Sequence, residues 1–144
     1  MVKSVDLAPD YVLEEQVGFL LRLASQRHFT IFHQNSVANL TPTQFSTLIR
    51  ISEQGEVSQN HLGRLAAMDV ATIKGVVDRL KAKALIQTRS DENDKRRTSI
   101  SLTKEGQSLV SELKSAGLKI SAETLAPLSD SETETLITLL KKIT

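Results

Sequence analysis

The fold is decided by residues 58–102, which read SQNHLGRLAAMDVATIKGVVDRLKAKALIQTRSDENDKRRTSISL. Apolar residues recur at helical spacing in the first half of this stretch and predict two short helices, one starting at Ser58 and one over residues 70–83. Ser58 and Asp69 precede these helices and can cap their first turns. The helical pattern breaks near Ala67, and two short helices joined by a three- or four-residue turn form a helix-turn-helix.

The spacing of the apolar residues changes after this unit, from a helical to a strand-like pattern. Residues 85–89 and 98–102 have strand character, and in the second segment Ile100 and Leu102 alternate with serine. The loop between them, residues 90–97, contains no apolar residue. A hairpin with a charged tip directly after a helix-turn-helix is a wing. The sequence therefore predicts a mostly α protein with a small β-hairpin wing.

The segment before this unit is also helical by its spacing. Residues 10–36 predict one long helix, capped by Asp10. Its wide apolar stripe needs partners on more than one side, and a dimer would supply them. A second helix starts at the capping box of Thr41, with Pro42 at its first position, and stops at Gly55.

Two further helices are expected after the wing. The first runs from about Thr103 to Leu125, and Gly106 and Gly117 weaken it enough to permit a bend. The last begins at the capping box of Ser129. No internal repeat interrupts this order, and 144 residues fit a single domain or one compact subunit of an oligomer.

Charge is distributed unevenly along the chain. The net charge of +1 predicts no partner, but residues 64–97 hold nine of the 18 Lys and Arg residues and carry +4, whereas the rest carries −3. A basic middle in a neutral chain is typical of a surface that binds a polyanion. A solvated charged surface is the alternative interpretation.

The composition argues against several other classes of protein. The chain has no cysteine, which excludes disulfides, cysteine nucleophiles and thiolate zinc sites. It has no nucleophile–base motif, glycine-rich phosphate loop or metal-ligand spacing, so we expect no enzyme, cofactor or metal. Residues 1–10 lack a signal-peptide pattern, and no apolar run approaches the roughly 20 residues of a membrane span. We expect a cytoplasmic protein.

Four features together resemble the MarR family (multiple antibiotic resistance regulators). They are the order of elements, the helix Asp69–Leu80, the wing Asp91–Arg97 and the segment Leu102–Gly106. The resemblance covers nearly the whole chain and implies a dimeric, ligand-responsive transcription factor. The part of the helix from Thr72 is most similar to the branch that controls aromatic-compound catabolism.

The resemblance also implies a division of the subunit, residues 1–144. Residues 40–103 would form the winged helix-turn-helix lobe, and the helices of residues 10–36 and 104–144 would form the dimer interface. In the family, small phenolic or aromatic acids often bind between these two parts.

The exposed face of the second short helix should enter the major groove of DNA. Thr72 and Lys74 can reach base edges or phosphates, and the Ala71 methyl can contact thymine. Thr72 could instead bond only within its own first turn. The remaining residues on this face are Gly75 and Asp78. Gly75 replaces the long polar residue usual in the family, and this allows two interpretations: a close approach of DNA to the backbone, or fewer contacts.

The wing and the first short helix complete the expected DNA surface. The resemblance assigns Arg79 to the DNA backbone or to a brace on the wing through an acid such as Asp94; a purely structural ion pair is the alternative. Arg96 is expected in the minor groove, where narrow A·T-rich segments attract arginine. The other expected contacts are Asn93, Lys95 and Arg97 of the wing, and Ser58, Gln59 and Asn60, which can bind phosphate.

An effector site is expected along the first helix. His28 lies on the apolar stripe and is either a hydrogen-bonded core residue or a ligand contact. Arg22, Gln26 and Arg27 lie nearby, and a cation beside an apolar cleft suits a carboxylate. The sequence thus predicts a homodimeric repressor that binds pseudo-palindromic double-stranded DNA and is released by a small aromatic or phenolic effector. A winged-helix protein-interaction module without DNA binding is the alternative.

Overall fold

The computed structural model describes residues 10–90, 92–94 and 96–144. Its helices are a 3₁₀ helix at Leu13–Glu15, then α1 (Val17–Gln34), α2 (Pro42–Gln54), α3 (Gln59–Leu65), α4 (Val70–Ala82), α5 (Lys104–Leu125) and α6 (Asp130–Lys142). Its strands are β1 (Glu56–Ser58), β2 (Ile86–Ser90) and β3 (Thr98–Leu102). The expectation of a mostly α protein with a small β wing is confirmed. No helix in the described part is long and apolar enough to cross a membrane.

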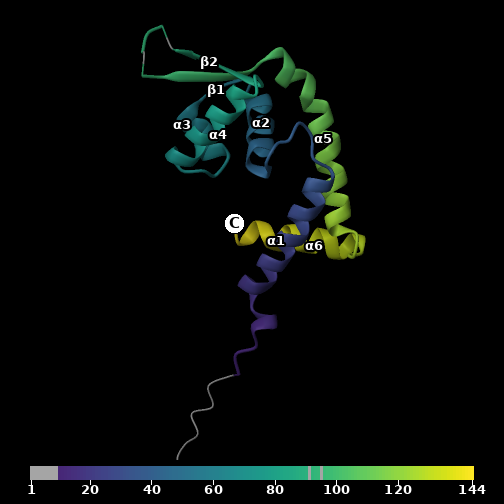
Figure 1. Cartoon of the computed structure of the whole chain (residues 1–144). Helices are drawn as coiled ribbons and strands as arrows, with labels where there is room; N and C mark the ends of the chain where they lie inside the picture. Colours follow the sequence, from purple (N-terminus) through teal and green to yellow (C-terminus); the bar gives the residue numbers. More distant parts are fainter. Residues whose placement is uncertain (1–9, 91, 95) are drawn as a thin grey trace, which may run out of the picture.

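The winged lobe has the upper position in Figure 1 and contains α2, α3, α4 and the three strands. The most deeply buried side chains of its core, with no more than 1% exposure, come from the helices and from β3. They include Leu48, Ile51, Leu62, Ile73, Leu80, Ile100 and, from α5, Leu113. Because α5 contributes to this core, its upper half is fixed to the lobe.

The predicted helix starts at Thr41, Ser58, Asp69 and Ser129 are confirmed. Thr41 and Ser129 form the capping boxes of α2 and α6, and Asp69 caps α4. Ser58 Oγ accepts a hydrogen bond from the amide of His61 at the start of α3. Gly55 follows α2 with φ of 75°, a left-handed conformation that favours glycine.

The single helix expected over residues 10–36 is wrong. A 3₁₀ turn comes first, Gln16 then has extended backbone (φ −82°, ψ 134°), and α1 begins only at Val17. The N-cap is therefore Gln16 rather than Asp10, and its side chain donates to the carbonyl of Val12 instead of capping. The apolar spacing continues across this break, which is why periodicity did not reveal it.

The wing is larger than the expected hairpin. Strand β1 pairs antiparallel with β3, which pairs antiparallel with β2, so the sheet order is β1-β3-β2. Ile86 lies opposite Leu102 and Val57 lies opposite Ile100. Strand β1 was missed because it has three residues and depends on a partner strand about 40 residues later.

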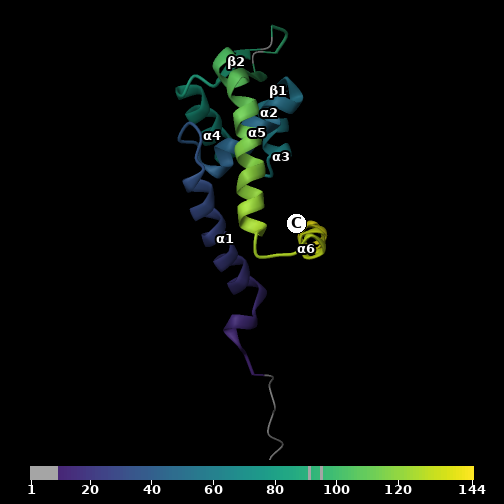
Figure 2. The ribbon, with the colours of Figure 1, turned by 90° about the vertical axis from the view of Figure 1, so that its right-hand side faces the viewer.

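The terminal helices extend away from the lobe. Figures 1 and 2 show α1 running beside α5 below the lobe, and Figure 2 shows α6 projecting sideways from the end of α5. Phe32 is the one buried residue of α1 in this subunit, and α6 has none. Helix α5 continues without interruption through Gly106 and Gly117.

Candidate functional site

Helix α4 presents a polar face to solvent at the outer side of the lobe. Four of its apolar residues are buried in the core, whereas Ala71, Thr72, Lys74, Asp78 and Arg79 are exposed and Gly75 is half-buried. Lys74 Nζ lies 3.1 Å from Asp78 Oδ2 one turn along. All the residues expected to face the major groove therefore share one accessible surface.

The start of α4 is fixed by Asp69. Its Oδ1 accepts a hydrogen bond from the amide of Thr72 at 2.7 Å. Hydrogen bonds from the amide and then the hydroxyl of Thr72 hold the pKa of Asp69 below its ordinary value. Thr72 thus bonds within its own first turn, and its contact with DNA stays a prediction.

The wing tip is folded around Asp94. Its side chain accepts from the amide of Arg96 at 3.0 Å, and its carbonyl accepts from the amide of Arg97 at 3.0 Å. Asp94 therefore shapes the backbone that carries the wing arginines. Among the ion pairs of the described residues there is none between Asp94 and Arg79. Lys95, also expected here, lies outside the described residues.

The wing arginines lie beside the start of α3. A hollow of about 410 Å³ lies between the wing and α3. It is lined by Ser58, Gln59, Asn60, Arg64, Arg96, Arg97 and Thr98. Three arginines and the first turn of a helix converge on this hollow, an arrangement that suits the phosphates of a DNA backbone. Arg64 is a residue that the sequence analysis did not select.

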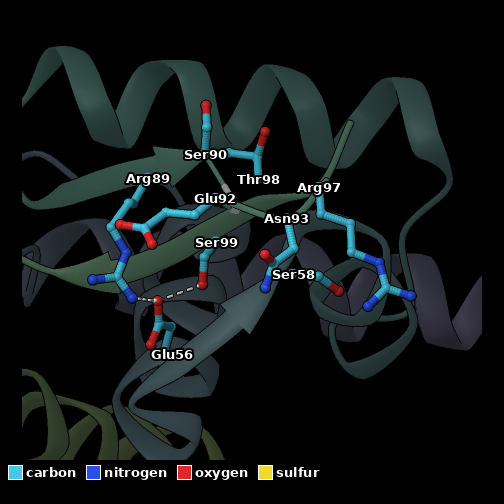
Figure 3. A pocket seen from close by; sticks show the side chains of 9 residues that line it. All are labelled: Glu56, Ser58, Arg89, Ser90, Glu92, Asn93, Arg97, Thr98 and Ser99. Carbon is cyan, nitrogen blue, oxygen red and sulfur yellow. Dashed lines mark hydrogen bonds and ion pairs between the residues drawn. The ribbon is translucent and has the colours of Figure 1, made fainter. Parts of the chain in front are cut away.

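The base of the wing carries a polar cluster that sequence reasoning also missed. Glu56 Oε1 accepts from Ser99 Oγ at 2.7 Å and from Arg89 Nη2 at 2.9 Å, as Figure 3 shows. The hydrogen bond from Ser99, and next the charge of Arg89, lower the pKa of Glu56. Arg89 is thereby paired within the protein. Since the cluster requires the pairing of β1 with β3, no local signal could have found it.

A second candidate site lies between α1, α2 and α5. A cavity of about 540 Å³ is lined mainly by apolar groups, among them Phe32 and Phe45, whose rings meet edge to face with centroids 5.7 Å apart. His28 and Lys114 are the charged or titratable residues in its lining. Lys114 was not selected from the sequence, because nothing local marks it among the lysines of α5.

His28 is the one of the four expected effector contacts that lines this cavity. Its Nδ1 lies 2.9 Å from Thr124 Oγ1, and that hydroxyl donates its hydrogen to the carbonyl of Ile120. The hydroxyl oxygen must therefore accept from Nδ1–H of His28, which leaves Nε2 of the neutral ring as an acceptor.

The other three expected contacts lie elsewhere. Arg27 donates to the carbonyls of Glu123 and Thr124 in the last turn of α5, where a cation is favourable. The guanidinium of Arg22 lies 5.4 Å from the centre of the Phe19 ring. Gln26 is exposed and lines none of the cavities described here. Arg27 thus joins α1 to α5 in this subunit.

A third hollow separates α6 from α1 and α5. It measures about 360 Å³, and its walls are strongly apolar. They include Leu21 and Phe29 of α1, Leu125 of α5, and Leu136, Ile137 and Leu140 of α6. Such a surface on a monomer indicates a contact with another molecule.

The recognition-type helix, the three-stranded wing and the helical layer below them define a winged helix-turn-helix protein. A family model described as MarR family matches residues 40–98. The HTH-type transcriptional repressor NicR of Pseudomonas putida is 39% identical over 134 residues, which are 92% of this chain and 85% of NicR. The chain belongs to the MarR family, whose members are transcriptional regulators.

Solved structures agree with this assignment. A probable transcriptional regulator from Pseudomonas aeruginosa is 46% identical with a TM-score of 0.88, and the match covers 92% of this chain and all of that one. BpsR of Bordetella bronchiseptica, whose DNA binding is regulated by 6-hydroxynicotinic acid, is 37% identical with a TM-score of 0.87. That match covers 94% of this chain and 97% of BpsR.

Proposed function

We propose that this protein is a homodimeric, sequence-specific DNA-binding repressor that a small aromatic acid releases from its operator. The observation that carries the proposal is the convergence of three arginines on the hollow between the wing and α3, on the lobe that also exposes the polar face of α4. A helix for the major groove and arginines for the backbone and minor groove are the parts that a winged helix needs to bind a duplex.

Dimerisation is proposed from the apolar surface that one subunit leaves uncovered. Helix α6 buries none of its residues, and the hollow between it and α1 and α5 is lined by leucine, isoleucine and phenylalanine. A second copy would cover this surface with the same helices, as in the usual two-fold dimer. In this proposal residues 40–103 are the DNA-binding lobe, and 10–36 and 104–144 contain the dimerisation helices.

The effector is proposed to occupy the cavity between α1, α2 and α5. An aromatic ring would pack against Phe32 and Phe45, and its carboxylate would pair with Lys114. Nε2 of His28 would accept from a hydroxyl or ring N–H of the ligand. The DNA binding of BpsR is regulated by 6-hydroxynicotinic acid, which has an aromatic ring, a carboxylate and a hydroxyl group. This supports an aromatic acid as the class of ligand.

The cavity also suits a regulatory role by its position. It is bounded by α2 of the lobe and by α1 of the helical layer. Two recognition helices must lie about 34 Å apart to enter successive major grooves. A ligand lowers DNA affinity if it binds more tightly to a dimer whose recognition helices have a different spacing from the one that fits DNA. The largest possible decrease is set by the ratio of the ligand's affinities for these two forms of the dimer.

The experiment is a titration of fluorescently labelled duplexes with the purified protein. The specific probe is a 30-base-pair duplex that the protein selects from a random pool, and the reference is an unselected duplex of equal length. We expect preference for an A·T-rich palindrome, a steep loss of affinity with salt, and release by 6-hydroxynicotinic acid but not by 2-pyridone, which lacks the carboxylate. If the random pool gives no enriched sequence and the protein does not bind the unselected duplex at low salt, a protein-interaction module is favoured instead.

The same proposal covers activity and location. A regulator of this kind acts through binding equilibria alone, so we infer that the protein is not an enzyme. We also infer that it works in the cytoplasm, where its DNA target is located.

A further inference from the structure

Gly75 occupies the middle of the exposed face of α4. It lies one turn after Ala71 and one turn before Arg79, beside the ion pair of Lys74 and Asp78. Glycine is among the poorest helix formers, and its φ here is not in the left-handed region. The backbone conformation of α4 therefore does not require glycine at this position.

Packing within the subunit does not require it either. A Cβ added at Gly75 would meet one heavy atom within 4 Å, a guanidinium nitrogen of Arg79 at 3.7 Å, which is an ordinary contact with the end of a flexible side chain. Alanine thus fits the free protein and would favour the helix. A bare backbone at this position would therefore matter only to something that approaches this face from outside the subunit.

At three other positions, packing inside the subunit does leave little or no room for a side chain. A Cβ at Gly106 would overlap the carbonyl of Leu85, and one at Gly117 would lie 3.1 Å from the ring of Phe45. Gly63 has a main-chain oxygen 3.2 Å from the same hypothetical atom. Each of these glycines permits a close contact inside the subunit, whereas at Gly75 the one neighbour within 4 Å is the end of the Arg79 side chain, at an ordinary contact distance.

We propose that Gly75 is a specificity-determining residue, at which the edge of a DNA base pair comes against the backbone of α4. The proposal rests on the proposed function. The major groove is about 12 Å wide, and a helix with its side chains is 10–12 Å across, so side chains on the inserted face limit the depth of insertion. With no side chain at residue 75, α4 lies deeper and presses Ala71 and its neighbours closer to the bases.

The alternative is that Gly75 merely makes fewer contacts, and the two interpretations predict opposite outcomes. If the bare backbone touches DNA, any side chain at residue 75 separates the surfaces and weakens specific binding, more so as it grows. If Gly75 only lacks a contact, Gly75→Gln restores one and strengthens binding. Because Gly75→Ala displaces nothing in the free subunit, a loss with this variant must arise in the complex.

The test measures wild type, Gly75→Ala and Gly75→Gln against the selected and unselected duplexes described above. We expect Gly75→Ala to bind the selected duplex about tenfold more weakly, Gly75→Gln more weakly still, and both to bind the unselected duplex within twofold of wild type at low salt. We expect Gly75→Ala to raise the Tm by a few degrees. Gly18→Ala, which adds a methyl on α1 where nothing lies within 4 Å, controls for helix stabilisation. Light scattering checks that this variant is still dimeric, and its DNA affinity should be unchanged.

Equal or tighter binding of the selected duplex by either variant would overturn this inference and leave the proposed function standing. A wild-type protein that does not distinguish the two duplexes would overturn the proposed function itself, and the inference with it. Random-pool selection repeated with Gly75→Ala adds a second readout, since a specificity-determining residue must change the preferred bases at the positions it faces.

Discussion

Glu56 Oε1 lies 2.9 Å from Arg89 Nη2, and this ion pair joins the first residue of β1 to the strand that leads into the wing. Both side chains are half exposed or more, so the pair contributes little to stability. Its consequence is electrostatic: the charge of Arg89, at the base of the wing, is paired within the protein.

Removing that negative charge should make DNA binding stronger and less selective. In Glu56→Gln, Arg89 is free to contact phosphate, so we expect affinity for unselected duplex to rise severalfold and the salt dependence to steepen by about one unit of slope. Titrations at several salt concentrations measure both. Glu53→Gln removes the equivalent partner of Arg50 on α2 and serves as the control. An unchanged slope in Glu56→Gln would contradict the prediction.

Arg96 should supply the preference for A·T-rich flanks. Arg96→Ala leaves the tip turn intact, because Asp94 accepts from the main-chain amide of residue 96. We expect roughly a tenfold loss on the selected duplex, concentrated at A·T-rich positions of the site. Lys119→Ala, on α5, removes one positive charge elsewhere and should have little effect. Arg96→Ala that binds like wild type would show that the wing does not enter the minor groove.

Lys114 should govern effector binding without affecting DNA binding. Lys114→Met keeps the length of the side chain and removes its charge, so the carboxylate of an aromatic acid loses its partner. We expect the concentration of 6-hydroxynicotinic acid that releases DNA to rise about tenfold, and the ligand-induced increase in Tm to shrink. Lys119→Met, outside the cavity lining, is the matched control. If Lys114→Met and Lys119→Met are released from DNA by the same concentration of 6-hydroxynicotinic acid, the carboxylate does not bind at Lys114.

Leu136 should be needed for assembly. It lines the apolar hollow between α6, α1 and α5. In Leu136→Glu a charge would be buried at the dimer interface, so we expect monomers by light scattering and loss of specific DNA binding. Thr138→Glu places the same charge on α6 outside the hollow lining and should remain dimeric. A dimeric Leu136→Glu protein would move the interface away from α6.

Stability should decrease in acid through three hydrogen-bonded carboxylates. Hydrogen bonds lower the pKa of Asp69, Glu56 and Glu132 in the folded protein. A lowered folded pKa means that the unfolded chain binds more protons as pH falls. The stabilisation from Asp69 is therefore present above 3.8, the ordinary pKa of this carboxyl, and is lost as pH falls through the lower folded pKa. Asp69→Asn keeps a capping oxygen without titrating, and its Tm should fall less between pH 5 and about pH 2.5. An equally steep fall would exclude this role for Asp69.

The helices of the winged lobe and α6 could be predicted well because their signals are local. Thr41, Asp69 and Ser129 bond to amides three residues along the chain, and apolar spacing depends only on helical geometry. The N-terminal helix was predicted less well, since nothing in the spacing marks the extended backbone of Gln16. The expected DNA contacts in the described part lie on accessible surfaces of the lobe, because exposure along a helix or a polar loop follows from the same periodicity.

The effector contacts could not be predicted in this way. His28 meets Thr124, 96 residues later, and Arg27, expected to bind a carboxylate, instead bonds to the end of α5. Lys114 reaches the same cavity as His28 only because α1 and α5 lie side by side.

The local sequence pattern was thus enough to predict the winged helix-turn-helix, its helix caps and its basic surface. Packing between distant segments established the third strand, the Glu56–Arg89 pair and the cavity between α1, α2 and α5. The physical reason is that hydrogen bonds within one turn are encoded by neighbouring residues. Contacts across the subunit exist only after the hydrophobic core has fixed how the helices lie against one another.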